Sequence, residues 1–347
     1  MTTPLVSIII PCYNGEEYVA EAIQSALDQT YPNFEVIVID DGSTDGTLDV
    51  IRSFGDAIRW ETGPNRGACA ARNRGIELAR GELIQFLDAD DLLYPQKLAR
   101  QVPLVVAKVA DIVVCDWVGY RVEAPHRSYV RSGAFDGSDP VIRALRKDIH
   151  TPAPVLWKEQ LMKIGGFREE LLIAQDTDLY LRLACTGVSF YHLPEVLYTV
   201  RTVPNSVSGN LVQQTIHRRQ VYWQAYEVLR ESGKLTDERA REFAAAMVRT
   251  ARLYLRLGMK AKGHELLADA RKMHPSGGIG LAYGRFSRVV ENLIGPFLTE
   301  QLIIMASWPR RCLSQSDMAY RVYWAIHGCR KRSRRSNTGN ILDEKHS

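Results

Sequence analysis

The chain has 347 residues, of which 46% are hydrophobic. Single hydrophobic cores stop growing at roughly 250 to 300 residues, so we expect one large domain with an appendage. The formal net charge of +4 is unevenly distributed, because residues 307–347 carry +6 and the rest of the chain carries about −2. The near-neutral body excludes the strongly basic composition of a nucleic-acid-binding domain.

The cysteines and the apolar runs indicate the compartment. Six cysteines lie too far apart for a zinc or thioredoxin motif and form no dense disulfide framework, so we interpret them as free thiols in a reducing cytoplasm. The first apolar run ends at Pro11, far short of a signal sequence, and no run reaches the roughly 20 apolar residues of a membrane helix. We therefore expect the chain to stay on the cytoplasmic side.

The first 110 residues read as strands that alternate with helices. Continuous β-branched runs predict strands at 6–10 and 34–39, a strand is also predicted at 82–87, and helical spacing predicts helices at 18–29, through 50–54 and at 68–79. This alternation predicts right-handed βαβ units and a mostly parallel sheet, whose ligands bind beyond the carboxyl ends of the strands. Two acidic clusters, at 40–41 and 88–91, fall at that edge.

The second half of the chain has a different pattern. We predict strands at 111–115 and 151–157, helices at 140–147 and 177–185, and a turn at 165–167. From about Leu211 onward, long helices follow without intervening strands. The expected domains are a donor half at about 1–105, an acceptor half at about 106–210, a helical appendage at 211–309 and a basic, partly disordered tail at 310–347.

The acidic cluster at 88–91 suggests a metal site. Asp88 and Asp90 flank one small residue, so a tight loop can aim both carboxylates at one hard cation such as Mg²⁺ or Mn²⁺. Such an ion would bridge a diphosphate. An acidic surface turn explains an isolated D-x-D equally, and the pattern alone leaves both interpretations open.

Two further acidic positions also allow two interpretations. Asp40 and Asp41 fit a turn and cap before the next helix, but at this edge a carboxylate can also accept from the N3–H of a uracil ring. Arg66 and Arg72 add positive charge nearby. Asp176 stands at the start of a predicted helix, where N-capping, a favourable macrodipole interaction and a catalytic base at the rim of the core are all compatible.

Five motifs in chain order resemble glycosyltransferase family 2, a large group of inverting enzymes with the GT-A fold. They are VSIIIPCYN at 6–14, VIDDGSTD at 38–45, NRGACAARN at 65–73, LDADD at 87–91, and GGF at 165–167 followed by QDTDLYLR at 175–182. The resemblance covers about residues 5–208. It implies an α/β fold with a GT-A-type nucleotide-binding sheet and flanking helices, here with a C-terminal helical appendage.

The resemblance also implies a function. It indicates a metal-dependent hexosyltransferase that transfers a sugar, with inversion, from a nucleotide diphosphate sugar, most simply a UDP-sugar, to an acceptor hydroxyl. Cell-surface glycan or polysaccharide synthesis is the expected setting, and the acceptor would be a glycan or a lipid-linked molecule.

Site residues follow from the resemblance position by position. The residues expected to hold the nucleobase are Pro11, Tyr13 and Asp41, with Glu17 and Arg72 in supporting donor contacts. Asp90 would be the main metal ligand and Asp88 the ribose or metal neighbour. Asp176 corresponds to the catalytic base, although Gln175 replaces the family's usual Glu and removes one charge beside it. Tyr198, Arg201 and residues 206–208 resemble a segment that closes over the diphosphate.

Two other functions stay open at this point. A sugar nucleotidyltransferase also places a base and a metal at such a sheet edge, but it usually has a Gly-rich loop where this chain has PCYNG at 11–15. A non-catalytic sugar-nucleotide-binding protein is disfavoured by the joint presence of Asp88, Asp90 and Asp176. The donor sugar is undetermined, and the simplest role of the acceptor-half residues Trp117, His150 and Trp157 is packing.

The C-terminal tail suggests a membrane contact. Residues 296–308 form an apolar segment that ends in Trp308 and precedes a run of arginines. Such a segment is too short to span a bilayer, but it can lie at an anionic surface, where each basic residue adds about 1 kcal/mol. Packing on the catalytic domain explains the apolar segment equally. We expect a cytoplasmic protein with peripheral contact at the inner membrane surface through the basic tail.

Overall fold

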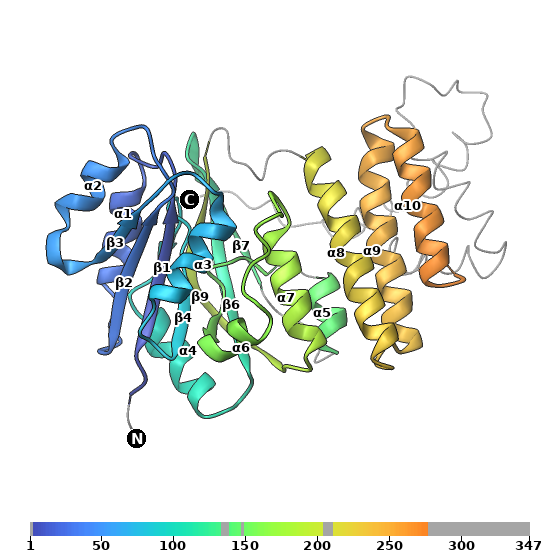
Figure 1. The fold of residues 1–347 in the computed structure, drawn as a ribbon, viewed down its shortest axis with the longest axis horizontal. Helices are drawn as coiled ribbons and strands as arrows, with labels where there is room; N and C mark the ends of the chain where they lie inside the picture. Colours follow the sequence, from blue (N-terminus) through green and yellow to red (C-terminus); the bar gives the residue numbers. More distant parts are fainter. Residues whose placement is uncertain (1–2, 133–138, 147–148, 204–210, 277–347) are drawn as a thin grey trace, which may run out of the picture. The chain divides into compact units, whose positions relative to one another are not determined.

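The computed structural model describes residues 3–132, 139–146, 149–203 and 211–276. The chain divides into two compact units, residues 1–239 and 240–347. The first contains a sheet whose strand order is β3-β2-β1-β4-β8-β6-β9-β5, with β7 paired to β6 outside that path. Figure 1 shows the fold along the chain. The domain bounds expected from the sequence, with a glycosyltransferase-like domain to about residue 210 and helices after it, stay a prediction.

The first four strands in space are all parallel. They are β3 (Arg59–Thr62), β2 (Phe34–Asp40), β1 (Val6–Cys12) and β4 (Leu83–Phe86). Every residue of β1 is buried, as expected for a strand covered on both faces. The helices that alternate with these strands are α1 (Val19–Leu27), α2 (Thr47–Ser53) and α3 (Ala68–Leu78), and a short 3₁₀ helix spans Gly55–Ala57.

Helix α3 lies unusually close to β1, and a glycine makes this approach possible. A Cβ at Gly75 would stand only 2.2 Å from a methyl carbon of Ile9. Because no larger residue fits there, Gly75 lets α3 pack directly on the central strand. This packing fixes the position of Arg72, which lies one turn earlier on the same helix.

The acceptor half has a mixed sheet. Its strands are β5 (Leu92–Leu93), β6 (Ile112–Arg121), β7 (Ala124–Arg131), β8 (Val155–Trp157) and β9 (Phe190–Thr202). β6 runs parallel to β9, whereas the β4–β8, β6–β7, β6–β8 and β5–β9 pairs are antiparallel. The helices in this half are α4 (Lys97–Val106), α5 (Pro140–Arg146), α6 (Lys158–Lys163) and α7 (Gln175–Cys185). The expectation of a mostly parallel sheet therefore holds for the donor half only.

Three local expectations differ from the structure. The turn at 40–44 does not cap α2, because that helix begins at Thr47 with Gly46 at its N-cap. The strand expected at 151–157 begins only at Val155, because the preceding residues turn through a bond from Ala153 N to His150 O of 2.9 Å. Helix α7 begins two residues earlier than expected, after Ala174 in the left-handed conformation.

Helices follow the sheet, as the sequence predicts. α8 (Leu211–Glu231) belongs to the first unit. The second contains most of α9 (Asp237–Arg256) and all of α10 (Lys260–Met273), where Gly263 packs against Leu255. None of the helices in the described part of the chain combines the length and the apolar composition of a membrane span. The basic tail and its apolar segment lie outside the described residues.

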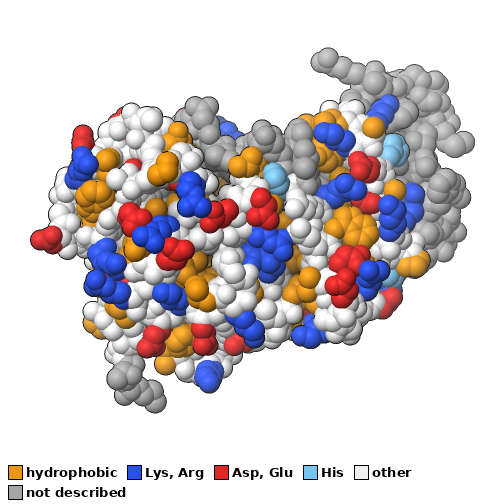
Figure 2. Space-filling model, in the orientation of Figure 1, with side chains coloured by type: hydrophobic (Ala, Val, Ile, Leu, Met, Phe, Trp, Pro, Cys, Tyr) orange, Lys and Arg blue, Asp and Glu red, His pale blue; other side chains and the backbone are white. Residues whose placement is uncertain are grey.

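The surface and the thiols agree with the composition. Figure 2 shows acidic and basic side chains interspersed over one face of the molecule, as expected for a body of low net charge. Cys12, Cys69, Cys115 and Cys185 are free thiols. The other two cysteines lie outside the described residues.

Candidate active site

The D-x-D sequence forms a tight turn directly after β4. Asp91 N donates to Asp88 O at 3.0 Å, which closes the turn. The carboxylate of Asp88 is 31% exposed, whereas Asp91 is almost fully buried. Burial, and then repulsion from Asp88, raise the pKa of Asp90 to about 6. Negative charge is therefore concentrated at this turn.

The turn fits a hard divalent cation that is shared with a phosphate ligand. In the described ranges, no three His, Cys, Asp or Glu side chains come together to hold a metal ion by themselves. Mg²⁺ usually keeps several waters and binds one or two carboxylates together with substrate phosphates. Asp88 and Asp90 offer that kind of donor set, and a cation there would relieve the repulsion that raises the pKa of Asp90.

Arg201, a buried arginine of β9, holds the D-x-D turn in place. Arg201 donates from its backbone N to Asp91 Oδ1 at 3.0 Å and from Nε to the carbonyl of Asp90. It also pairs with Glu21, and its guanidinium lies 5.1 Å from the Tyr18 ring centre. The turn is thus fastened to a strand more than a hundred residues later in the chain.

This arrangement corrects the expectation of a closing segment. Arg201 is 5% exposed and Tyr198 only 1%, because both belong to β9 inside the sheet. A side chain packed in the core has no room to fold over a ligand. The other expected members, residues 206–208, lie outside the described residues.

Arg72 links the acidic turn to α7. Its Nη2 donates to Asp88 Oδ1 and its Nη1 to Gln175 Oε1, both at 2.6 Å. The guanidinium lies 5.2 Å from the Phe167 ring centre and is buried. Although burial disfavours the charged form, the carboxylates of Asp88 and Asp176 raise the pKa of Arg72. A permanent positive charge therefore stands between the D-x-D turn and the start of α7.

Gln175 has a structural reason to replace the family's usual Glu. While its Oε1 accepts from Arg72, its Nε2 donates to the carbonyl oxygens of Leu171 and Leu172 at 3.0 and 3.2 Å. A carboxylate can accept but cannot donate. The amide therefore connects Arg72 to the loop before α7, which a glutamate could not do.

Asp176 is the second residue of α7 and is partly buried. Burial is the main cause that raises the pKa of Asp176, and the charge of Asp88 raises it further. Arg72, the hydrogen bond from Thr151 and His150 act in the opposite direction and lower this pKa. Thr151 Oγ1 donates to Asp176 Oδ1 at 2.5 Å. A positioned carboxylate with a raised pKa has the properties of a general base.

The turn that carries Thr151 is held from beneath by residues that the sequence did not indicate. Lys97 Nζ and Gln101 Nε2 donate to the carbonyl of Ala153 at 3.1 and 3.0 Å. Tyr180 of α7 donates to the Thr151 carbonyl at 3.4 Å. Burial lowers the pKa of Lys97 to about 8. Because these contacts join positions far apart in sequence, no local pattern predicts them.

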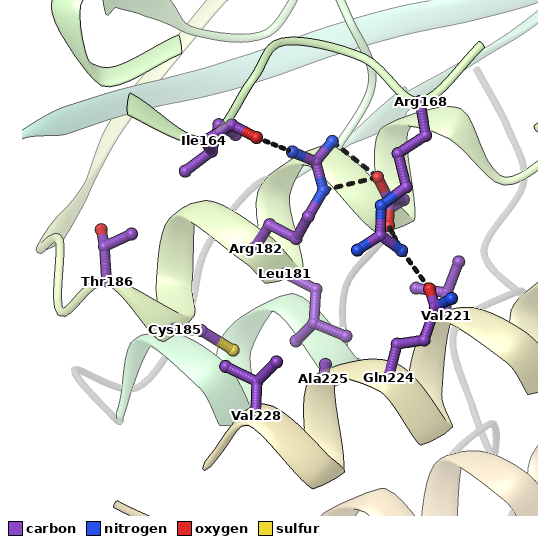
Figure 3. Close-up of a pocket in the computed structure, with 11 residues that line it drawn as sticks. Ile164, Arg168, Leu181, Arg182, Cys185, Thr186, Val221, Gln224, Ala225 and Val228 are labelled. Carbon is purple, nitrogen blue, oxygen red and sulfur yellow. Dashed lines mark hydrogen bonds and ion pairs between the residues drawn. The ribbon is translucent and has the colours of Figure 1, made fainter. Parts of the chain in front are cut away.

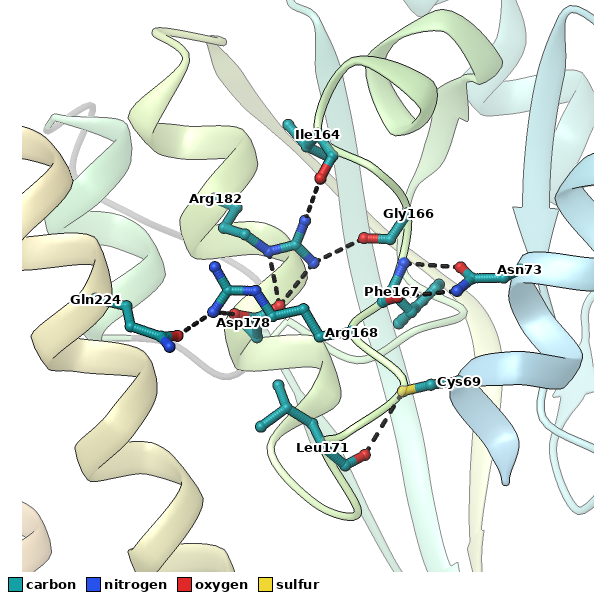
Figure 4. A network of polar contacts seen from close by, with 10 residues as sticks. All are labelled: Cys69, Asn73, Ile164, Gly166, Phe167, Arg168, Leu171, Asp178, Arg182 and Gln224. Carbon is teal, nitrogen blue, oxygen red and sulfur yellow. Dashed lines mark hydrogen bonds and ion pairs between the residues drawn. The ribbon is translucent and has the colours of Figure 1, made fainter. Parts of the chain in front are cut away.

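Asp178 is a structural carboxylate. It is 2% exposed and forms ion pairs with Arg182 at 2.6 Å and with Arg168 at 3.2 Å. Figure 3 shows Arg168 and Arg182 beside a cavity of about 240 Å³ between α7 and α8, where Arg168 also meets Gln224 of α8. Both guanidinium groups converge on Asp178 (Figure 4). These pairs anchor α7, so Asp178 has no role in capping the helix.

The GGF turn at 165–167 binds Asn73, the last residue of the NRGACAARN motif. Asn73 Oδ1 accepts from Phe167 N at 2.8 Å, and Asn73 Nδ2 donates to Phe167 O at 2.9 Å (Figure 4). A Cβ at Gly166 would stand 2.5 Å from Asn73 Oδ1. Arg182 holds the same loop through the carbonyls of Ile164 and Gly166. The loop that positions Phe167 under Arg72 is therefore fixed from both sides.

The residues expected to hold the nucleobase lie at or just beyond the carboxyl ends of β1 and β2. Pro11 is buried within β1, Tyr13 is 52% exposed just after it, and Glu17 is exposed in the loop before α1. Asp41 is buried, and its two oxygens accept from Arg66 N and Gly67 N at 2.8 Å each. A carboxylate has about four acceptor sites, so these bonds leave capacity for a ligand.

The acidic turn and the buried Arg72 lie at the carboxyl edge of the parallel strands, where open α/β sheets bind their ligands. A family model, described as glycosyl transferase family 2, matches residues 7–158. An uncharacterized glycosyltransferase of Rickettsia typhi is 34% identical over 235 residues, which cover 65% of this chain and 72% of that protein. The putative teichuronic acid biosynthesis glycosyltransferase TuaG of Bacillus subtilis is 31% identical over 228 residues, covering 60% and 82%. The chain therefore belongs to glycosyltransferase family 2.

Solved structures of low sequence identity share the fold. The crystal structure of Staphylococcus aureus TarS 1–349 with UDP-GlcNAc superposes with a TM-score of 0.53 at 17% identity and covers 80% of this chain and 91% of that one. The mannosyltransferase PcManGT of Pyrobaculum calidifontis, in complex with GDP-Man and Mn²⁺, gives 0.54 at 18% identity and covers 88% of each chain. The expected fold, a GT-A sheet with flanking and C-terminal helices, is confirmed.

Proposed function

We propose that this glycosyltransferase transfers a sugar, with inversion, from a nucleotide diphosphate sugar, in the first instance a UDP-sugar, to an acceptor hydroxyl. The observation that carries the proposal is the continuous connection from Asp88 through Arg72 and Gln175 to Asp176. It joins Asp88 and Arg72, which can act on the leaving diphosphate, to Asp176, a carboxylate that can deprotonate the acceptor. Binding alone would not require both.

The donor contacts follow from the positions at the sheet edge. Tyr13 offers an exposed ring for the nucleobase, and Asp41 has acceptor capacity for a ring N–H, with Pro11 and Glu17 next to them along the chain. Asp90 and Asp88 would hold Mg²⁺ or Mn²⁺, which supplies positive charge against the departing diphosphate. Arg72 keeps the Asp88 carboxylate in position and adds a fixed positive charge behind it.

The transfer step needs one base and no covalent sugar intermediate. Asp176 takes the proton of the acceptor hydroxyl while the acceptor oxygen forms a bond to the anomeric carbon. The bond from that carbon to the diphosphate oxygen breaks, and the diphosphate leaves with the electron pair. Because attack and departure occur on opposite faces of the carbon, its configuration inverts. Thr151 holds the Asp176 carboxylate in the orientation that receives the proton.

The similarity to a putative teichuronic acid glycosyltransferase supports a role in the synthesis of a cell-surface polysaccharide. We place the reaction on the cytoplasmic side, where the acceptor is a glycan or a lipid-linked precursor. Contact of the basic tail with the inner membrane surface would bring such an acceptor close. These assignments rest on the sequence and on the relative.

The test is release of nucleoside diphosphate from a panel of nucleotide sugars, with Mn²⁺, Mg²⁺ or a chelator, in the presence of candidate acceptors. We expect metal-dependent release of nucleoside diphosphate, with UDP-sugars preferred. The anomeric configuration of the product, read from the coupling of its anomeric proton, should be opposite to that of the donor. Binding without release would support a non-catalytic sugar-nucleotide-binding protein. Pyrophosphate production from a sugar 1-phosphate and a nucleoside triphosphate would support a nucleotidyltransferase.

A further inference from the structure

The hairpin of β6 and β7 carries an aromatic surface outside the proposed donor site. In its antiparallel register, Trp117 lies opposite Arg131, and Gly119 lies opposite Tyr129. Directly opposed residues share a face of the sheet. We call these four residues, Trp117, Gly119, Tyr129 and Arg131, the hairpin face.

The rings of the hairpin face form a connected group with His150. Trp117 lies 5.7 Å from Tyr129 and 4.5 Å from His150 between ring centres. The buried ring of Tyr198 supports Trp117 from the neighbouring strand at 6.2 Å, nearly parallel to it. Tyr129 is 43% exposed, and Trp117 and His150 are partly exposed. The group therefore packs against the core through Trp117 and offers the exposed parts of its rings to a ligand.

Gly119 is required for this arrangement. A Cβ at this position would stand 2.6 Å from the Trp117 ring, 2.7 Å from the Tyr129 ring and 2.8 Å from the Tyr129 hydroxyl. Both rings lie over the bare backbone of Gly119, which is buried although the hairpin is at the edge of the sheet. Any side chain at 119 would force the two rings apart.

The aromatic group begins next to the candidate base. His150 directly precedes Thr151, which donates to Asp176, and the charge of His150 is one of the influences on that carboxylate. A molecule lying along the hairpin face would therefore have one end near Asp176. An acceptor must occupy that position, because its hydroxyl has to reach the base.

The charge of the hairpin face indicates the kind of acceptor. β7 contains Arg127 and Arg131 and no acidic residue, and both arginines are exposed. The Arg131 guanidinium lies 5.2 Å from the Tyr129 ring centre, so a cation stands beside an exposed ring. Sugar rings present apolar C–H faces that stack on aromatic rings, and arginine binds carboxylate and phosphate groups in a bidentate manner.

Building on the proposed transferase function, we propose that the hairpin face binds the acceptor, and that the acceptor is an acidic glycan. Trp117 and Tyr129 stack against its sugar rings, while Arg131 binds its anionic groups, carboxylate or phosphate. The donor site and Asp176 are not part of this surface. Recognition of the acceptor and activation of its hydroxyl are thus assigned to different residues.

The test measures binding by calorimetry with the full chain and three probes of equal length. They are a glucuronic acid/N-acetylglucosamine hexasaccharide, a glycosyl phosphate oligomer and neutral chitohexaose. We expect the acidic probes to bind at least tenfold more tightly than the neutral one, with the stronger acidic probe identifying carboxylate or phosphate. Tyr129→Ala should weaken binding of the acidic probes at least tenfold, and Trp117→Phe about threefold. Arg131→Gln should remove most of the preference for acidic probes.

Val130→Ala is the matched control, because Val130 is 63% exposed on the same strand but on the opposite face. It should bind the probes like the wild type, and the melting temperature of every variant reports folding. Gly119→Ala should weaken binding as Tyr129→Ala does. Equal affinities of Tyr129→Ala and Val130→Ala, or no binding of any probe to the wild type, would overturn the proposal.

Hydrolysis of the nucleotide sugar by water, measured separately, distinguishes this proposal from the proposed function. We expect the hairpin variants to release nucleoside diphosphate at the wild-type background rate. If no nucleotide sugar is cleaved either by water or with a candidate acceptor present, but the probes bind the hairpin face, the transferase assignment fails. If cleavage occurs and the variants bind the probes normally, only the acceptor surface is wrong.

Discussion

Replacing Thr151 by Val tests the environment of the candidate base. Thr151 is 1% exposed, and valine fills nearly the same volume, so the substitution removes one hydroxyl and little else. That hydroxyl donates to Asp176 Oδ1 and lowers the pKa of the carboxyl against the effect of burial. The backbone carbonyl of residue 151 keeps its bond from Tyr180.

The size of the effect follows from the bond that is lost. A hydrogen bond to a charged group contributes about 1.5 to 3 kcal/mol, and one pKa unit corresponds to about 1.4 kcal/mol. Losing this bond should therefore raise the pKa of Asp176 further in Thr151→Val. The base acts in its ionised form, so activity falls as the pH drops through this pKa. A higher pKa means that the variant loses activity at a higher pH than the wild type.

The assay is the pH dependence of kcat/KM, measured by nucleoside diphosphate release at constant donor, acceptor and metal. The acid limb of Thr151→Val should lie at higher pH than that of the wild type, with activity recovering as the pH rises further. Thr151→Ser keeps the hydroxyl and should leave the limb in place. Coincident acid limbs of Thr151→Val and the wild type would refute the assignment of Asp176 as the titrating base.

Three other predictions concern the metal, the donor loop and the tail. Asp90→Ala should abolish Mn²⁺-dependent binding of the nucleoside diphosphate in calorimetry; unchanged affinity would make the D-x-D a surface turn. Gly42→Ala should destabilise the fold by about 1 to 3 kcal/mol in denaturant unfolding, because Gly42 has φ +77° and its Cβ would stand 2.8 Å from Asn65 N and Gly63 O. Gly55→Ala, at φ +54° with open space around it, is the control and should cost less; equal losses would show that the contacts at 42 do not matter. Deleting residues 309–347 should weaken cosedimentation with anionic liposomes at low salt, and equal cosedimentation of both proteins would remove the membrane contact.

The donor half was predictable because its signals are local. The β-branched runs of β1 and β2, the apolar residues of β4 and the helical spacing of α1 and α3 are each visible within about a dozen residues. The acidic clusters after β2 and β4 then fall at the carboxyl edge by topology alone. Capping was misjudged there, because Asp41 bonds Arg66 N and Gly67 N, which follow it by 25 and 26 residues.

The acceptor half was harder to predict because its site depends on distant contacts. Arg201 reaches the D-x-D turn from 110 residues away, and Thr151 meets Asp176 through a turn that resembles a strand in sequence. β9 and the β6–β7 hairpin are partly exposed, so their apolar alternation is weak. Gln175 bonds Arg72 and the carbonyl oxygens of Leu171 and Leu172 at the same time. From the sequence, only the absence of the family's usual glutamate charge was visible.

The central claim is that Asp176 is the base of sugar transfer, and Asp176→Asn tests it most directly. Asparagine keeps the shape and can still accept from Thr151, but it cannot take the acceptor proton. Affinity for the nucleotide sugar in calorimetry should stay near the wild-type value, while turnover falls by about 10²- to 10⁴-fold. Transfer at a near-wild-type rate by Asp176→Asn would contradict the account.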